Sequence, residues 1–252
     1  MPCSHSHSSG HSHSHPPSVS AANTAHFDSQ AHTYGTNPSH LAIAAHITTS
    51  LLSTLPLTPT STLLDYACGP GLLSKSLAAH VGRIRGIDLS PAMVAAYNEA
   101  VSNQGIPRDE MCAFVGDICD DKDAEGLELE MGEGFEGFDV VVCSLALHHV
   151  ADPGKAAERL VKATKVGGVV AVVEFARHGG EGMEGLESVV TKHGFSREDV
   201  KGLLESAGCG EVGFVEVGPR GDGKGVTFVR EVGGKERRIE REVFLVTGKR
   251  LQ

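Results

Sequence analysis

The sequence predicts an α/β fold in which helices cover an open, mainly parallel sheet. From residue 63 onward, short apolar runs alternate with segments of helical periodicity, which is the pattern of parallel strands joined by helices. The chain has 252 residues and is 40% hydrophobic, so it can form one large domain with a sizeable core. A glycine-rich turn at 65–71 follows the first predicted strand. Ligands of open α/β sheets bind at such strand ends.

The first 60 residues differ in composition from the rest. Residues 1–25 are rich in Ser, His and Pro, and we expect a disordered tail because they hold too few apolar side chains to offset chain entropy. His-rich tracts can chelate metals, but this spacing is unspecific and we predict no metal site. Residues 26–60 are predicted to form a helical arm or lid, with a helix that Ser39 caps and that ends before Pro56. The main domain is then predicted to span 61–252.

The strands of this domain follow in order. Ser90-Pro91 and Asp152-Pro153 pair an N-cap residue with a proline at the first helical position, and so mark the helices after the second and fourth strands. The fourth strand is the most apolar and is expected to be central. If the sheet order is 3-2-1-4-5, the ends of the first three strands are adjacent and line one crevice. The five strands are predicted at about 63–67, 83–88, 111–115, 138–144 and 169–175.

The remaining segments are a Gly-rich loop or lid at 176–195, a helix capped by Ser196, and two strands at 211–218 and 240–248. An extra strand is possible at Val226–Val229. We expect the helix at 39–55, the 176–195 segment and the 219–240 insertion to recognise the substrate, since they carry the least regular patterning.

Charge and cysteine content exclude several classes. The formal net charge is −10, which argues against a general nucleic-acid binder. The stretch 109–136 holds eleven acidic residues and one lysine, as in a solvated helix and loop. The six cysteines are scattered without a C-x-x-C pair, which favours a reducing compartment. The sequence contains no run of about 20 apolar residues, which is the length needed to span a membrane. We therefore expect a soluble, cytoplasmic protein.

Three strand ends together indicate an adenosine ligand. Asp88 ends the second strand 19 residues after Gly69, where a carboxylate can accept hydrogen bonds from both hydroxyls of a ribose. Asp117 ends the third strand, where it could meet an adenine amino group. A dinucleotide fold requires G-x-G-x-x-G, but Ser74 replaces the third glycine. No Gly-Lys-Ser or Gly-Lys-Thr follows the strand, which excludes a P-loop.

These segments resemble the class I S-adenosylmethionine-dependent methyltransferases, in the ubiquinone/menaquinone-biosynthesis-type (methyltransferase type 11-like) small-molecule branch. The similarity covers about 60–250 and rests on five motifs in order: Asp65-Tyr66-Ala67-Cys68-Gly69-Pro70-Gly71, Gly86-Ile87-Asp88-Leu89-Ser90, Gly116-Asp117-Ile118, the run from Phe138 to Val150, and Val166-Gly167-Gly168-Val169. The resemblance implies a Rossmann-like, doubly wound, mostly parallel seven-stranded sheet of order 3-2-1-4-5-7-6, with the last strand antiparallel and helices on both faces.

The resemblance also implies a set of cofactor-binding residues. In the first motif these are Asp65, Ala67, Gly69 and Gly71, of which the two glycines would pass close to the methionine moiety. The family usually has glycine where Ala67 stands, and we expect an ordinary backbone dihedral there. Elsewhere, Asp88 would hold the ribose, Leu89, Asp117 and Ile118 would frame the adenine, Ser144 and Leu145 would lie beside the sulfonium, and Tyr34 of the arm could reach the methionine carboxylate.

Methyl transfer needs little acid–base chemistry, because positioning and desolvation do most of the work. A base matters only where the acceptor loses a proton. His148 and His149 follow the fourth strand on the acceptor side and are the candidate bases. His178 and His193 lie in the predicted lid segment, and we interpret them as surface or structural histidines.

Four functions are open. The favoured one is methylation of a small-molecule acceptor. The second is a protein or peptide methyltransferase, and the absence of a recognisable peptide-binding module in this sequence argues against it. The third is a non-catalytic S-adenosylmethionine-binding protein, which would bind the cofactor without turnover. Ser74 disfavours a nucleotide-dependent oxidoreductase. An RNA acceptor is disfavoured by the acidic charge.

Overall fold

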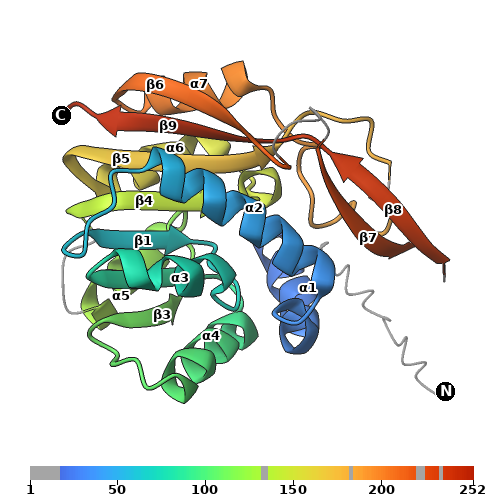
Figure 1. Ribbon diagram of the computed structural model, residues 1–252, viewed down its shortest axis with the longest axis horizontal. Helices are drawn as coiled ribbons and strands as arrows, with labels where there is room; N and C mark the ends of the chain where they lie inside the picture. Colours follow the sequence, from blue (N-terminus) through green and yellow to red (C-terminus); the bar gives the residue numbers. More distant parts are fainter. Residues whose placement is uncertain (1–17, 132–135, 182–183, 220–224, 233–234) are drawn as a thin grey trace, which may run out of the picture.

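The computed structural model describes residues 18–131, 136–181, 184–219, 225–232 and 235–252. Its largest element is a seven-stranded sheet of order β3-β2-β1-β4-β5-β9-β6 (Figure 1). Strands β1 to β5 are parallel, and β9 lies antiparallel between β5 and β6. The predicted fold is confirmed, with β9 as the seventh strand. The strands are β1 (Thr62–Tyr66), β2 (Arg83–Asp88), β3 (Met111–Val115), β4 (Phe138–Ser144), β5 (Thr164–Phe175), β6 (Cys209–Val217) and β9 (Val243–Arg250).

Helices cover both faces of this sheet, because successive strand residues point to opposite sides. Leu64 packs with α5, α6 and α7, where Leu160 and Leu204 are fully buried. Its neighbour Leu63 packs with α2, α3 and α4 on the other face, where Leu51 is fully buried. The helices are α1 (Val19–Tyr34), α2 (Pro38–Thr54), α3 (Leu72–Leu77), α4 (Pro91–Asn103), α5 (Asp121–Met131), α6 (Pro153–Ala163) and α7 (Arg197–Ser206), with short 3₁₀ turns η1 (Ala78–His80) and η2 (Leu147–His149).

The predicted helix starts are confirmed by their hydrogen bonds. Ser90 caps α4 by accepting from the backbone N–H of Met93 at 3.1 Å. Asp152 caps α6 in the same way. Ser196 and Asp199 form a reciprocal capping box at the start of α7. Each cap satisfies an N–H group that the first helical turn leaves unpaired.

The predicted arm differs in two respects from the structure. The disordered tail was predicted to reach residue 25, but α1 begins at Val19 and its Asn23 is only 1% exposed; residues 1–17 lie outside the described part. Helix α2 begins at Pro38 with Asn37 as its cap, not with Ser39. Helix α1 has no apolar periodicity in sequence because its inward face is polar and aromatic, so a hydrophobic pattern could not reveal it.

The insertion before the last strand forms a separate hairpin. Strands β7 (Val226–Val232) and β8 (Lys235–Arg241) pair antiparallel, which confirms and extends the possible strand at 226–229. The hairpin projects beyond the main sheet beside the arm helices (Figure 1). The backbone N–H of Val229 donates to the Ser39 hydroxyl at 2.9 Å. The arm and the insertion are therefore joined at one end of the molecule.

Candidate functional site

Two cavities lie side by side at the carboxyl ends of the central strands. Cavity A has a volume of about 300 Å³ and is lined from β1, β2, β4 and helix α1. Cavity B has a volume of about 400 Å³ and extends between the glycine-rich turn, α2 and the loop after β4. They share part of their walls, so that a ligand in one can meet a ligand in the other. The shared lining residues are Phe27, Tyr34, Ala67, Gly69, Ser144, Leu145 and His149.

Asp88 is the best-anchored carboxylate of cavity A. Its Oδ2 accepts from the backbone N–H of Gly69 at 2.8 Å, and its Oδ1 accepts from that of Ser90 at 2.9 Å. The side chain is 7% exposed. Burial raises its pKa and nearby Asp28 raises it further, whereas the two backbone hydrogen bonds lower it. The carboxylate thus joins the segments that follow β1 and β2 while it lines the cavity, and ribose binding by Asp88 stays a prediction.

The residues predicted to frame the adenine differ from one another in where the structure places them. Asp117 lines cavity A, where its Oδ1 accepts from the Tyr66 hydroxyl at 3.1 Å. Leu89 lines the same cavity, together with Met93 that the sequence interpretation missed. Ile118 does not line either cavity: it is fully buried in the core beneath α5 and α6. The prediction for Ile118 is wrong because the strand-end turn directs its apolar side chain inward.

The turn at 65–71 departs from expectation at Ala67. This alanine has a φ of 57°, in the left-handed region, where an ordinary dihedral was expected. Gly69 lines both cavities as predicted. Gly71 lines neither, and its φ is 79°. A Cβ at Gly71 would lie 2.6 Å from the ring of Tyr97, so this glycine is required for close packing of the turn on α4 rather than for ligand contact.

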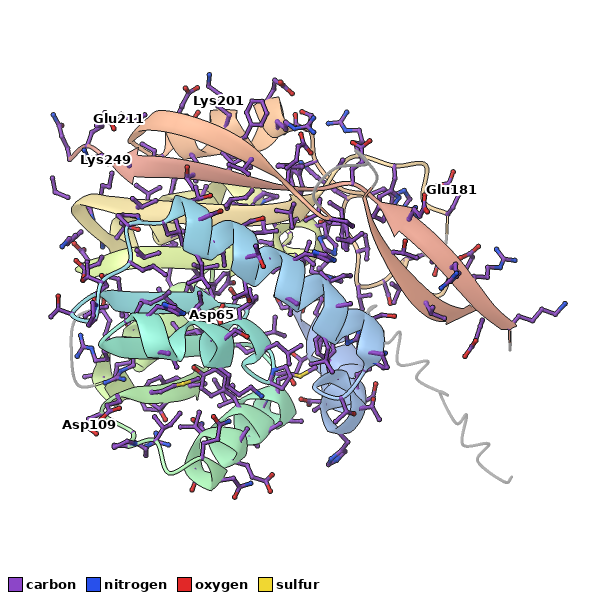
Figure 2. The ribbon with its side chains drawn as sticks, in the orientation of Figure 1. Asp65, Asp109, Glu181, Lys201, Glu211 and Lys249 are labelled. Atoms are coloured by element: carbon purple, nitrogen blue, oxygen red, sulfur yellow. The ribbon has the colours of Figure 1, made fainter. Side chains whose placement is uncertain are left out.

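Asp65, which is labelled in Figure 2, forms a buried pair with Ser74. The Ser74 hydroxyl donates to Oδ2 of Asp65 at 2.6 Å. Asp65 lines cavity B and is 3% exposed. Burial raises the pKa of Asp65 to about 7, against the opposing effect of the Ser74 hydrogen bond. The residue that replaces the third glycine of a dinucleotide motif therefore supports the acid of the turn.

His148 is coupled to a glutamate that the sequence interpretation missed. Its Nδ1 lies 2.9 Å from Oε2 and 3.1 Å from Oε1 of Glu174. Glu174 is completely buried on β5 and also accepts from the backbone N–H of His148 at 3.2 Å. His148 lines cavity B. The carboxylate holds the proton on Nδ1 and leaves Nε2 as the basic ring atom. Its position as an acidic residue within an otherwise apolar predicted strand was the sequence feature that could have identified Glu174.

His149 has a different environment from its neighbour. It lines both cavities, and its Nδ1 lies 2.8 Å from the carbonyl oxygen of Val189. Because only a protonated nitrogen can donate to a carbonyl, Nδ1 carries the hydrogen. Burial, and then the proximity of His148, lower the pKa of His149 to about 3. His149 is therefore neutral at physiological pH and packs edge-on against Phe27.

The arm forms the outer wall of both cavities. Tyr34 lines both, and burial followed by the charge of Asp88 raises its pKa to about 12. Helix α1 is held in place by Asp28, whose Oδ1 accepts from the Ser90 hydroxyl at 2.5 Å. Asn23 donates through Nδ2 to the carbonyl oxygen of His149 at 3.2 Å. The arm thus contacts the loops that carry both Asp88 and the histidine pair.

The predicted lid at 176–195 is attached to the histidine loop. The Thr191 hydroxyl donates to the carbonyl oxygens of His148 at 2.9 Å and Val150 at 3.0 Å. Within this segment, His178 and His193 stack on each other with ring centroids 5.6 Å apart. They line neither cavity A nor cavity B, in agreement with their interpretation as structural histidines.

Metal clusters and membrane-spanning helices are both absent from the described residues. No cluster of three or more His, Cys, Asp or Glu side chains has metal-site geometry in the part of the chain that the structure describes. In the same residues, no helix combines the length and the apolar character needed to cross a bilayer.

Comparisons with known proteins agree with this geometry. Residues 64–172 match the family model described as a methyltransferase domain. An uncharacterized methyltransferase of Schizosaccharomyces pombe is 34% identical over 152 residues, which are 58% of this chain and 52% of that protein. The ubiquinone biosynthesis O-methyltransferase of Idiomarina loihiensis is 30% identical over 108 residues, which are 43% of this chain and 40% of that protein. The chain thus spans about half, or less, of the length of these relatives.

A solved structure shows the same fold. Haemonchus contortus phosphoethanolamine N-methyltransferase 2, in complex with S-adenosyl-L-methionine, superposes with a TM-score of 0.60 at 16% identity. The superposition covers 82% of this chain and 52% of that one. These comparisons show that residues 64–172 are similar to a methyltransferase domain and that the chain shares the fold of this solved structure.

Proposed function

We propose that this protein is an S-adenosylmethionine-dependent methyltransferase that acts on a small-molecule acceptor. The carrying observation is the pair of adjoining cavities at the strand ends. Cavity A presents carboxylates where the cofactor is proposed to bind, and cavity B contains the His148–Glu174 pair where the acceptor is proposed to bind. The matches to proteins named methyltransferases support the same activity.

The lining of cavity A fits a cationic ligand rich in hydrogen-bond donors. Its charged residues are four carboxylates and one lysine, and the lysine, Lys155, lies 3.0 Å from Asp121 outside the cavity. An adenosyl sulfonium offers two ribose hydroxyls, an amino group and positive charge to such a wall. The pyrophosphate of a dinucleotide would instead meet repulsion. The four carboxylates are Asp88, Asp117, Asp120 and Asp152.

When bound, S-adenosylmethionine supplies a methyl group on a sulfonium, whose carbon–sulfur bond breaks with its electron pair passing to sulfur. The protein itself would bind and orient the two reactants and accept one proton. Asp88 and Asp117 would hold the adenosine, while Ser144 and Leu145 would position the reacting groups where the cavities meet. His148 Nε2 would take the acceptor's proton as the acceptor's nucleophilic atom bonds to the methyl carbon. Glu174 would stabilise the imidazolium that forms.

Cavity B favours an uncharged acceptor. Among the described residues that line it, the titratable side chains are Asp65, Tyr34, Cys68 and four histidines, with no lysine or arginine. Burial lowers the pKa of His149 to about 3 and also lowers that of His40. An anionic acceptor would therefore find no permanent positive charge there. The relatives named ubiquinone biosynthesis O-methyltransferases support a small-molecule acceptor, and the net charge of −10 disfavours RNA.

The described cysteines are all free, which supports our proposal of a reducing, cytoplasmic location.

The proposed activity is tested in two steps. Calorimetry should show binding of S-adenosylhomocysteine and not of NADH; preference for NADH would refute the cofactor. Labelled S-adenosylmethionine is then incubated with metabolite extracts. Label transfer to small molecules supports the proposal, transfer to protein favours the peptide alternative, and binding without any transfer favours a non-catalytic role.

A further inference from the structure

Two residues with a left-handed backbone stand where the cavities meet. Ala67 has a φ of 57° and Leu145 a φ of 52°, and both line cavity A and cavity B. Glycine adopts this conformation freely, whereas an L side chain is strained in it. The third such residue in the described chain, Glu211, is exposed at the bulge of β6. Two of the three strained side chains therefore line the boundary between the cavities.

The conformation at the boundary is imposed by the neighbouring backbone. After Ala67, the N–H of Cys68 donates to the carbonyl of Ile87 at 3.1 Å, and the N–H of Gly69 donates to Asp88. The N–H of Leu145 donates to the carbonyl of Val173 at 2.8 Å. These bonds would hold a glycine equally well, so the backbone does not require a side chain at either position, although Ala67 and Leu145 each pack partly against the core. Strain that persists at a ligand site indicates a functional use for the strained group.

We infer that Ala67 and Leu145 set the size of the alkyl group that the protein accepts on the cofactor's sulfur. This inference rests on the proposed function, which places the sulfonium at the boundary of the two cavities. The methyl group of Ala67 and the side chain of Leu145 narrow that boundary from β1 and β4. On this inference the boundary admits a methyl group on sulfur, and a longer alkyl group would meet the Ala67 side chain.

Binding measurements test this without knowledge of the acceptor. Calorimetry compares S-adenosylhomocysteine, S-adenosylmethionine and S-adenosylethionine with the wild type, Ala67→Gly and Glu211→Gly. The last two ligands carry the same charge and differ by one methylene. Glu211→Gly is the matched control, since it relieves the same backbone conformation on β6, away from Asp65 (Figure 2). An extra methylene that does not fit is worth about tenfold in affinity.

We expect the wild type and Glu211→Gly to bind the ethyl sulfonium about tenfold more weakly than the methyl sulfonium. Ala67→Gly should reduce this difference to about twofold or less, measured as the ratio of the two sulfonium affinities within that variant. Equal binding of both sulfoniums by the wild type would overturn the inference, as would an unchanged ratio in Ala67→Gly. If the wild type binds none of the three ligands, the proposed function itself fails, so the two failures are distinguishable.

Discussion

Replacement of Asp88 by alanine tests the assignment of the whole site. The carboxylate lines cavity A and accepts from the N–H groups of Gly69 at 2.8 Å and Ser90 at 2.9 Å. If it also accepts from two ribose hydroxyls, its removal costs two hydrogen bonds to a charged group, each worth about 1.5 kcal/mol or more. The loss of about 3 kcal/mol corresponds to about a hundredfold lower affinity for S-adenosylhomocysteine.

The same substitution also weakens the fold. Two buried N–H groups lose their acceptor, and each such group costs about 1–3 kcal/mol when no water replaces it. Urea unfolding of the free protein should therefore show a free energy of unfolding lower by about 2 kcal/mol or more. Calorimetry is performed at a temperature where the variant is fully folded, so that the change in affinity refers to the site alone.

Asp139→Ala is the matched control. Asp139 lies near the amino end of β4, where its Oδ2 accepts from the N–H of Thr62 at 2.8 Å and from its hydroxyl at 2.9 Å. It lines neither cavity. This variant should lose stability and keep its ligand affinity. If Asp88→Ala, folded, bound S-adenosylhomocysteine as tightly as the wild type, the assignment of cavity A would be wrong.

Three further predictions follow from the same geometry. Burial raises the pKa of Asp65 to about 7, so this acid gains a proton as the pH falls below 7. Because only the ionised carboxylate attracts an ammonium group, the affinity for a ligand that carries one should rise as the pH increases from about 6 to 8. Asp65→Asn should remove this pH dependence of the affinity measured by calorimetry. Gly71→Ala should lower the free energy of unfolding by about 1–3 kcal/mol, measured in urea, because a Cβ there lies 2.6 Å from the Tyr97 ring and φ is 79°; unchanged stability would contradict the packing role. Glu174→Gln should lower turnover about 10²-fold or more once an acceptor is found, with S-adenosylhomocysteine affinity retained, and full turnover would exclude the His148–Glu174 base.

The amino-acid sequence was sufficient to predict the sheet and the edge at which the two cavities lie. Apolar runs of strand length, separated by capped helices, predict a parallel sheet because each run is buried on both faces. The carboxylates at Asp88 and Asp117 were predictable for the same reason, since each directly follows a strand and parallel strands end on one edge. Ser90 and Ser196 marked helix starts through local hydrogen bonding that needs no tertiary context.

Which side chains contact one another depends on the packing of elements that are distant in the chain. Helix α1 lacks apolar periodicity because it faces cavities and not the core, so its Asn23 and Phe27 could not be placed from sequence. Glu174 of β5 is paired with His148 of η2, the turn that follows the adjacent strand β4, a contact between residues 26 apart in the chain. Ile118 was misassigned because a strand-end position does not state which way a side chain points. Ala67 was expected to be unstrained because its left-handed backbone is imposed by hydrogen bonds between neighbouring strand ends, which no local pattern encodes.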